Sequence, residues 1–298
     1  MTEELNLPLS WNWIQQEADS ISRFKLSNNR IWITSASLHT EKNESFLEIL
    51  SNFKEKNLLI RGLNESQKIL MCRKGFEALY SGLEAEIDLN NYINRKKSLI
   101  ELIKRGLKKG SVIEYSVNKI TEEKINDLLK HSRHSDEPKL KYLFQTEINE
   151  NIRIFVLEDR TKNLLGGITI SRNSKTKYHA ELLIKRKGAP VGVMEALIDG
   201  VCLKLIDEGV AKFSLGEVPL IVNKPLKLKG KFIHLLGKIL SANYNYKGLF
   251  NFKNKFNPNW KPLYICAYPK IYYSDLVKVS IASNLFRLFL FRFRKLIS

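Results

Sequence analysis

The chain has 298 residues, 44% of them hydrophobic, which is enough for a sizeable core and about two domains. Its formal net charge is +18, and segment 221–298 contributes fifteen Lys and Arg residues against one acid, Asp275. This surplus indicates a polyanionic partner, either nucleic acid or an anionic membrane. Three distant cysteines, no signal-like leader and no apolar run of about 18 residues argue against secreted and membrane-spanning classes. We expect a cytoplasmic protein, peripheral at the inner face of the membrane.

The first 110 residues alternate between strand and helix patterns, which predicts an α/β unit. We expect a helix at 11–24, where two tryptophans share a partly apolar face. Asn64 is suited to cap a later helix that Gly75 ends. The other elements expected here are a strand at 30–38, a helix at 45–56, a strand at 57–60, a hairpin of 76–80 and 83–89 turning at Ser81-Gly82, and a basic helix at 94–110.

From Ser111 onward the order of elements is more informative than any single residue. We expect strands at 111–117, 152–158, 164–171, 178–185, 211–215 and 261–267, and helices at 121–130, 139–145, 193–207 and 229–240. The order β-α-α-β-β-β-α-β-α-β resembles that of GNAT acyltransferases, in which the loop before the central helix presents backbone N–H groups to phosphates. We therefore predict an α/β fold with mixed sheets and two tandem GNAT-like units, 1–110 and 111–276, followed by a basic amphipathic tail, 277–298.

Segment 248–269 concentrates lysine, aromatic rings and turn residues, and it is the strongest candidate for a site. Lys253 and Lys255 are two apart, so in an extended segment both ammonium groups leave the same face. Phe252 and Phe256 can anchor that segment in a core. The alternative is an edge strand on which paired lysines only prevent aggregation.

Four segments carry a closer resemblance: 75–89, 189–198, 213–220 and 245–264. Together they resemble the C-terminal domain of phosphatidylglycerol lysyltransferases, in which two GNAT-like units move an aminoacyl group from tRNA to an anionic phospholipid. The resemblance implies an aminoacyltransferase that uses aminoacyl-tRNA as donor and needs no bound cofactor. It implies tRNA and an anionic membrane lipid such as phosphatidylglycerol as partners, or another small hydroxyl or amino acceptor. We expect this chain to lack the flippase portion that usually precedes the domain.

The resemblance also implies site residues. Glu181 stands in place of a family aspartate, and it would hold the ammonium of the amino acid or act as a base. Its alternative is an ordinary outward carboxylate. Lys253 and Lys255 match the K-x-K-[FY]-x-P-x-W lysines, and they would bind phosphate or stabilise the oxyanion. We further predict substrate-binding roles for Lys185, Arg186, Glu217, Asn251, Trp260 and Tyr264.

Departures from the family pattern keep other functions open. Ile184 and Leu263 stand where the family has arginines, and Lys261 replaces an acid. One alternative is an acyl-coenzyme A transferase that uses the loop 185–192. Another is a membrane-binding or nucleic-acid-binding relative without catalysis.

Histidines give weaker signals. His131 and His134 lie three apart without a third ligand, so we predict no metal site. We place His179 one residue out of the strand face that holds Glu181, which disfavours a dyad.

The tail ends in NLFRLFLFRFRKLIS. On a helical wheel Leu288 and Phe291 fall out of place, and four basic residues lie opposite the apolar face. That face consists of Leu285, Phe286, Phe289, Leu290, Phe293, Leu296 and Ile297. This composition is typical of an interfacial helix that meets anionic headgroups. The alternative is a terminal helix packed on its own domain or in a dimer. No pattern specifies the amino acid, the acceptor or the oligomeric state.

Overall fold

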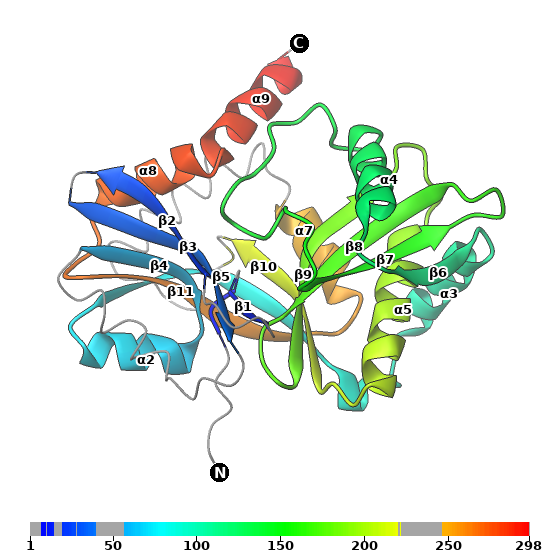
Figure 1. Cartoon of the computed structure of the whole chain (residues 1–298), viewed down its shortest axis with the longest axis horizontal. Coiled ribbons are helices and arrows are strands. Elements are labelled where there is room, and N and C mark those ends of the chain that lie inside the picture. Colours follow the sequence, from blue (N-terminus) through cyan, green and yellow to red (C-terminus); the bar gives the residue numbers. More distant parts are fainter. Residues whose placement is uncertain are drawn as a thin grey trace.

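The structure is a computed structural model that describes residues 7–9, 11–14, 20–27, 29–39, 57–219, 221 and 246–297. Within them one mixed sheet crosses the molecule, with helices packed on its faces (Figure 1). The strands are β1 Asn12–Ile14, β2 Ser20–Ser27, β3 Arg30–His39, β4 Leu58–Leu63, β5 Glu77–Asp88, β6 Ser111–Tyr115, β7 Ile152–Glu158, β8 Leu164–Arg172, β9 Lys177–Lys185, β10 Lys212–Pro219 and β11 Asn259–Ala267. The helices are α2 Glu65–Arg73, α3 Lys97–Leu107, α4 Lys119–Lys130, α5 Val193–Asp207, α7 Tyr246–Asn254, α8 Tyr273–Ala282 and α9 Leu285–Ile297, with a short 3-10 helix at Leu89–Asn91. The predicted mixed α/β class is confirmed.

The strand order joins the two halves of the chain. It runs β1-β3-β4-β11-β5-β10-β9-β8-β7-β6, and β2 pairs with β3 beside this path. Although β11 is the last strand in the sequence, it pairs antiparallel with both β4 and β5. β5 in turn pairs antiparallel with β10. The sheet is therefore continuous across residue 110, and the division into units 1–110 and 111–276 stays a prediction.

Strands β9 and β10 start as parallel neighbours and then part. Their pairing ends where Ser214 lies opposite His179. Just beyond, Gly216 has a φ of 83°, and the register of β10 against β5 shifts between Ser214 and Glu217. Glycine adopts a positive φ without the steric cost that a Cβ imposes. The result is a splay between β9 and β10, at which side chains of both strands meet.

Helices α4 and α5 cover opposite faces of the C-terminal half of the sheet. Two consecutive residues of β7 show this, because Phe155 packs in the core under α5 whereas Ile154 packs in the core under α4. In α5, Leu197 and Val201 are fully buried, and burying each side chain of this size contributes about 1.5–3 kcal/mol. The splay is thus held by strands that are packed on both faces.

The described parts of segment 11–24 include strand residues 12–14 and 20–24, so the helix predicted there is wrong. β1 pairs parallel with β3, and β2 pairs antiparallel with β3. Trp11 is 1% exposed and packs beside Ile33 of β3 in the same core. Pairing with a neighbouring strand supplies the backbone hydrogen bonds and overrides the local helical spacing.

β5 is a single strand, so the hairpin predicted at Ser81-Gly82 is also wrong. Both of its edges are paired, one with β11 and one with β10. A Cβ added to Gly82 would lie 2.5 Å from the carbonyl oxygen of Val218. This glycine therefore serves a close approach of two strands rather than a turn.

Segment 139–145 contains no helix, which corrects a third prediction. The helices predicted at 45–56 and 229–240 lie outside the described residues. The other predicted elements are confirmed to within a few residues.

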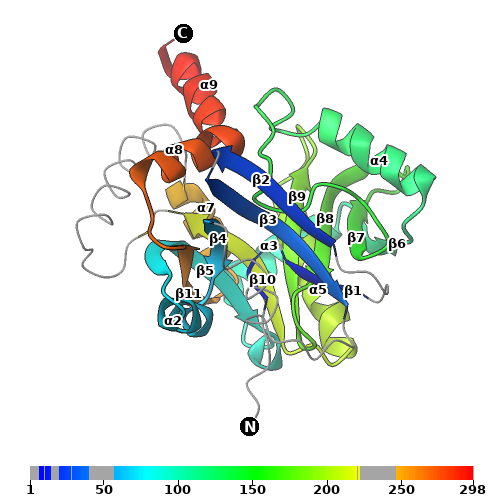
Figure 2. The same ribbon diagram turned by 60° about the vertical axis from the view of Figure 1, so that its left-hand side comes forward.

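The tail forms two helices, separated at Asn284, whose φ is 62°. Figure 2 shows α8 beside β2 and α9 leading away from the sheet to the C-terminus. Among the described helices, none is both long and apolar enough to cross a bilayer.

Candidate active site

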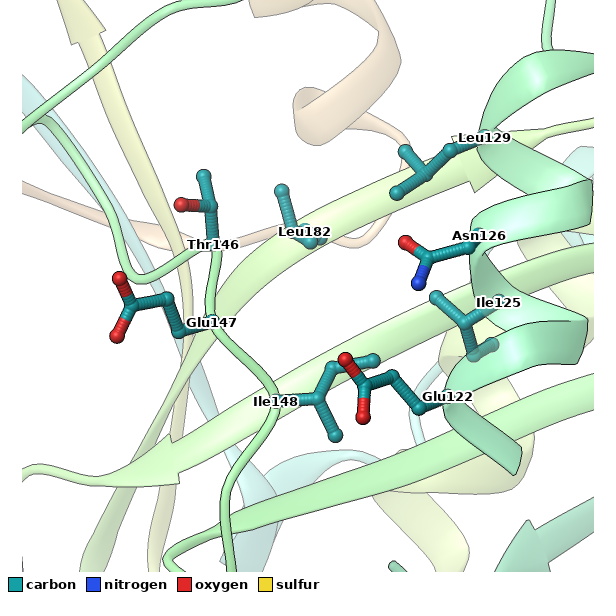
Figure 3. A pocket seen from close by; sticks show the side chains of 8 residues that line it. All are labelled: Glu122, Ile125, Asn126, Leu129, Thr146, Glu147, Ile148 and Leu182. Carbon is teal, nitrogen blue, oxygen red and sulfur yellow. The ribbon is translucent and has the colours of Figure 1, made fainter. Parts of the chain in front are cut away.

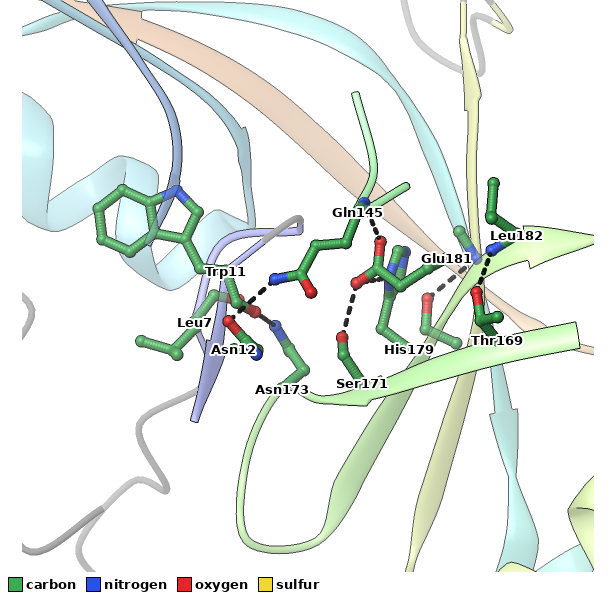
Figure 4. A network of polar contacts seen from close by, with 12 residues as sticks. Leu7, Trp11, Asn12, Gln145, Thr169, Ser171, Asn173, His179, Glu181 and Leu182 are labelled. Carbon is green, nitrogen blue, oxygen red and sulfur yellow. Dashed lines mark hydrogen bonds and ion pairs between the residues drawn. The ribbon is translucent and has the colours of Figure 1, made fainter. Parts of the chain in front are cut away.

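Glu181 sits in a bulge of β9 and is fully enclosed. The register between β8 and β9 shifts around it, so it is the extra residue of that strand. The Ser171 hydroxyl donates to Oε1 at 2.6 Å, and the Gln145 backbone N–H donates to Oε2 at 2.7 Å (Figure 4). Burial would raise the pKa of Glu181, but neighbouring His179 and these donors outweigh burial and hold it below its usual value. Glu181 is therefore an ionised carboxylate inside the protein, not an outward one.

His179 lies between Glu181 and the splay. Its Nδ1 is 3.3 Å from Oε1 of Glu181, although the angle does not make a hydrogen bond. Its Nε2 faces Gly216, where an added Cβ would lie 3.3 Å away from it. The same Cβ would lie 3.7 Å from Nζ of Lys253. The prediction that His179 and Glu181 occupy different faces is wrong, because the distance of 3.3 Å from Nδ1 to Oε1 puts both side chains on the same side of β9.

Lys253 approaches the splay from a helix, which corrects the extended segment predicted for residues 248–256. It belongs to α7, is 3% exposed, and donates from Nζ to the backbone carbonyl of Glu217 at 3.0 Å. Burial lowers the pKa of Lys253 to about 7, against the opposing effects of Glu217 and Glu84. Phe252 and Phe256 do pack into the core, with ring centroids 5.8 Å apart. The amine of Lys253 is thus buried, and near pH 7 both its charged and its uncharged form are populated.

Lys255 points elsewhere, so the two lysines do not share a face. Its Nζ is 2.7 Å from Oε1 of Glu195 in the first turn of α5. Lys185 lies in the same group: burial lowers its pKa, Arg133 and Lys255 act in the same direction, and Glu195 opposes them. The start of α5 is therefore surrounded by cations, of which Lys255 is 39% exposed along its side chain.

Glu217 contacts other residues of the candidate site through both its backbone carbonyl and its carboxylate. Its Oε2 pairs with Arg61 of β4, and the Ser81 hydroxyl donates to Oε1 at 2.9 Å. The carboxylate is therefore already neutralised, while the carbonyl of the same residue holds Lys253. The sequence analysis missed Arg61 and Ser81, because nothing in their local pattern links them to residue 217.

The other predicted site residues have separate surroundings. Arg186 donates to the carbonyl of Leu164 and pairs with Asp127. Asn251 is exposed on α7. Trp260 stacks on Phe250 with centroids 4.4 Å apart and donates to Asn254, and Tyr264 donates to Glu65. Ile184 and Leu263 are 4% and 1% exposed, so core positions stand where the family has arginines.

A pocket of about 380 Å³ lies between α4, β9 and the loop at 146–148 (Figure 3). Leu182, on its wall, follows Glu181 in sequence, and Thr146 follows Gln145. The sequence analysis singled out none of its lining residues, which come from three separate segments. They are Glu122, Ile125, Asn126, Leu129, Thr146, Glu147, Ile148 and Leu182.

Comparison with known proteins identifies the family of the chain and the proteins that share its fold. The mixed sheet that parts between β9 and β10 is shared with solved structures, and the family match identifies the chain as a transferase. The family model described as phosphatidylglycerol lysyltransferase, C-terminal, matches residues 96–267, which is more than half of the chain. The chain belongs to this family.

Individual relatives agree with the family match. A phosphatidylglycerol lysyltransferase of Bacillus subtilis (strain 168) is 30% identical over 118 residues, which is 37% of this chain and only 14% of that relative's length. The structure of L-PGS from Bacillus licheniformis has a TM-score of 0.71 and 17% identity, covering 90% of this chain and 86% of that one. A C-terminal DUF2156 domain from Agrobacterium fabrum has a TM-score of 0.69 and 18% identity, covering 90% and 84%. At these identities the two structures establish the fold.

Proposed function

We propose that the chain moves an aminoacyl group from aminoacyl-tRNA to a hydroxyl of an anionic phospholipid such as phosphatidylglycerol, or to another small hydroxyl or amino acceptor. Family membership supports transferase activity of this type. The observation that carries the proposal is the meeting of His179 and Lys253 at Gly216, with ionised Glu181 behind the imidazole. A buried lysine whose pKa is lowered to about 7, close to other ionisable side chains, is typical of catalytic sites.

The proposed transfer uses these groups in separate roles. The acceptor oxygen bonds to the ester carbonyl carbon, and the bond from that carbon to the ribose oxygen of the tRNA breaks. His179 takes the acceptor proton and returns it to the departing ribose oxygen, while Glu181 stabilises the imidazolium. Lys253, when protonated, stabilises the oxyanion. Both oxygens of Glu181 already accept hydrogen bonds, which favours this role over direct binding of the substrate ammonium.

The pocket between α4 and β9 has room for the aminoacyl side chain. Its floor is apolar, with Ile125, Ile148 and Leu182 (Figure 3). Glu122 stands beside this floor, and among the described residues no ion pair neutralises its carboxylate. An aliphatic side chain ending in a positive charge complements such a surface.

The acyl-coenzyme A alternative has less support at the loop 185–192. Glu195 places a carboxylate in the first turn of α5, where the alternative requires a diphosphate. That carboxylate already pairs with Lys255. A Cβ on Gly192 would lie 2.2 Å from the carbonyl oxygen of Leu102, so α3 packs directly against this helix start. A relative without catalysis is also less favoured, because a binding module has no need of a buried amine with a pKa near 7.

The proposed location is the inner face of the cytoplasmic membrane, with α8 and α9 as the docking surface. Phe286, Leu290 and Phe293 are 45%, 38% and 47% exposed along one side of α9. Leu288, which the helical wheel left out of place, is instead the side chain buried against the protein, at 5% exposure. Arg287 lies exposed beside the apolar residues and can meet anionic headgroups.

A transfer assay with mass-spectrometric detection tests the proposal. The protein is incubated with charged tRNA and phosphatidylglycerol vesicles, and in parallel with coenzyme A thioesters. We expect aminoacyl lipid from charged tRNA, a loss of product for Lys253→Met, and no change for Glu123→Gln on the exposed side of α4. Product only from thioesters would establish the alternative enzyme. Binding of tRNA or vesicles without product from either donor would establish a binding module.

A further inference from the structure

Segment 137–145 joins the C-terminal helices to the body of the protein. Arg292 of α9 makes a forked contact with Glu137, at 2.6 and 3.3 Å to its two carboxylate oxygens. The Asn284 side chain, between α8 and α9, donates to the carbonyl of Lys139 at 2.8 Å. Forked Arg–carboxylate pairs fix orientation as well as distance. This end of the segment is therefore attached to α9 and to the turn before it.

The other end of the segment is bonded to the proposed site. The Gln145 N–H donates to Glu181 at 2.7 Å (Figure 4). Between the two ends, Tyr142 has a φ of 62° and packs its ring 5.2 Å from Phe24 and 5.9 Å from Trp32. A non-glycine residue in this conformation is held there by its surroundings. The segment lacks ladder hydrogen bonds of a strand or helix, so its position depends on these contacts.

Arg61 connects this segment to the second reactive group. One of its guanidinium nitrogens donates to the carbonyl of Leu143 at 3.2 Å, and another pairs with Glu217. The carbonyl of Glu217 in turn accepts from Lys253. Arg61 is only 13% exposed along its side chain. A single buried guanidinium thus fixes segment 137–145 relative to the residue that holds the amine.

We propose that Arg61 and segment 137–145 form a positioning bridge, through which docking of α8 and α9 on an anionic bilayer sets the geometry of Glu181 and Lys253. The proposal rests on the proposed function for its consequence in catalysis, but its structural part does not need turnover. Arg61 and Glu137 are positioning residues, since each acts through another residue. The partner is a bilayer because the exposed face of α9 combines aromatic side chains with arginines.

Hydrogen exchange read by mass spectrometry tests the bridge without turnover. The full chain is measured alone and with vesicles of equal parts phosphatidylglycerol and phosphatidylcholine. We expect vesicles to slow exchange of the amides at 137–145 and at 179–182 several-fold. In Glu137→Gln, which breaks the pair with Arg292, slowing at 179–182 is lost although the variant still sediments with the vesicles. The control is Glu101→Gln, which breaks the exposed Lys104–Glu101 pair and should behave as the parent. Unchanged exchange at 179–182 in the parent would overturn the bridge.

The pH profile of Arg61→Gln supplies a readout that a purely structural role would not move. Removing the guanidinium leaves the Glu217 charge unneutralised beside Lys253, and a nearby negative charge raises a lysine pKa. We expect the pH at which Lys253 titrates, followed by NMR of labelled lysine, to rise by about one unit. The paired control, Arg153→Gln, removes a guanidinium bound by Glu114 and Glu208 and should leave that titration in place. A well-folded Arg61→Gln with an unchanged titration would contradict the role given to Arg61.

The two proposals can fail separately. If the parent protein shows the exchange effect but makes no product, the proposed function is refuted and the bridge is not.

Discussion

Lys253 reaches across the splay to the backbone carbonyl of Glu217, with 3.0 Å between Nζ and the oxygen. The lysine comes from a helix and the carbonyl from β10, so the contact joins α7 to the sheet where β9 and β10 part. Burial lowers the pKa of Lys253 to about 7, and the nearby carboxylates only partly oppose it. Small changes in pH therefore change the charge at the centre of the proposed site.

The first prediction concerns activity against pH. If the ammonium of Lys253 stabilises the oxyanion, kcat/KM falls as pH rises through about 7, because this parameter reports the free enzyme. Lys253→Met removes this limb and lowers kcat/KM most below about pH 7, where the lysine of the parent is protonated. If kcat/KM instead rises as pH increases through about 7, the active form of Lys253 is the neutral amine, which would act as a base.

Stability should respond to the same group with a defined sign. Between about pH 7 and the ordinary lysine value near 10.5, the unfolded chain binds a proton that the folded chain does not. The Lys253 contribution to the free energy of unfolding therefore becomes less unfavourable as pH rises over this window. Urea unfolding of the parent and Lys253→Met should show the difference between them shifting in favour of the parent on going from about pH 6.5 to about pH 9.5. A difference that stays constant would contradict the lowered pKa.

Glu181→Gln tests the carboxylate behind His179. The amide can still accept from Ser171 or Gln145, but it cannot stabilise an imidazolium, so kcat should fall by about 10²-fold or more. The folded pKa of Glu181 is depressed, so its contribution to stability is present above the unfolded value near 4.5 and is lost as pH falls below it. Acid unfolding should accordingly be less steep in the variant. Full activity in Glu181→Gln would remove the residue from the mechanism.

Lys255 and Glu195 should have opposite effects on anion binding. Their pair partly neutralises the cations at the start of α5. Lys255→Ala should weaken tRNA binding and reduce the slope of log affinity against log salt by about one. Glu195→Gln frees the ammonium and should strengthen binding at low salt. Titration of labelled tRNA at several salt concentrations measures both, and equal affinities in the two variants would exclude this cluster from tRNA contact.

The sequence predicted the order of most elements because their apolar periodicity is local. It failed where distant strands decide conformation. Ser81-Gly82 carries a turn signal, yet pairing on both edges keeps β5 a single strand. Lys253 and Lys255 were assigned one face because an extended segment was assumed. In the structure Lys253 points inward from α7, whereas Lys255 lies just after that helix and pairs with Glu195.

The candidate site was predictable only in part, for the same reason. Lys253 was singled out by the composition of its segment and Glu181 by resemblance to a family. The structure places Lys253 and His179 at the splay, with Glu181 behind the imidazole. Arg61 and Gln145 reach it from separate segments, and Gln145 acts through its backbone N–H, which leaves no trace in residue type. Sequence spacing cannot report contacts of this range.

The carboxylate of Glu122 at the pocket leads to a prediction about which aminoacyl-tRNA donor is preferred. Glu122→Gln removes a carboxylate beside the apolar floor, so it should lower the preference for lysyl over alanyl donors several-fold while changing the alanyl rate little. Competition between two charged tRNAs in one reaction measures the ratio. Glu123→Gln is the matched control, since Glu123 is the next residue of α4 and does not line the pocket. Equal ratios in all three proteins would exclude Glu122 from donor selection.

Helix α9 has two faces with separable roles. Leu288 is 5% exposed, so Leu288→Ala should cost about 2 kcal/mol or more in the packing of α9 while leaving the outer face intact. Leu290 is 38% exposed, so Leu290→Ser should leave stability within about 0.5 kcal/mol and reduce binding to the membrane. Sedimentation with phosphatidylglycerol vesicles should pull down the parent and Leu288→Ala, and less of a variant that combines Leu290→Ser with Phe286→Ser and Phe293→Ser. Neutral phosphatidylcholine vesicles should bind all of them weakly, because the arginines then lack anionic headgroups. If the triple variant sediments like the parent, the exposed face of α9 is not the docking surface.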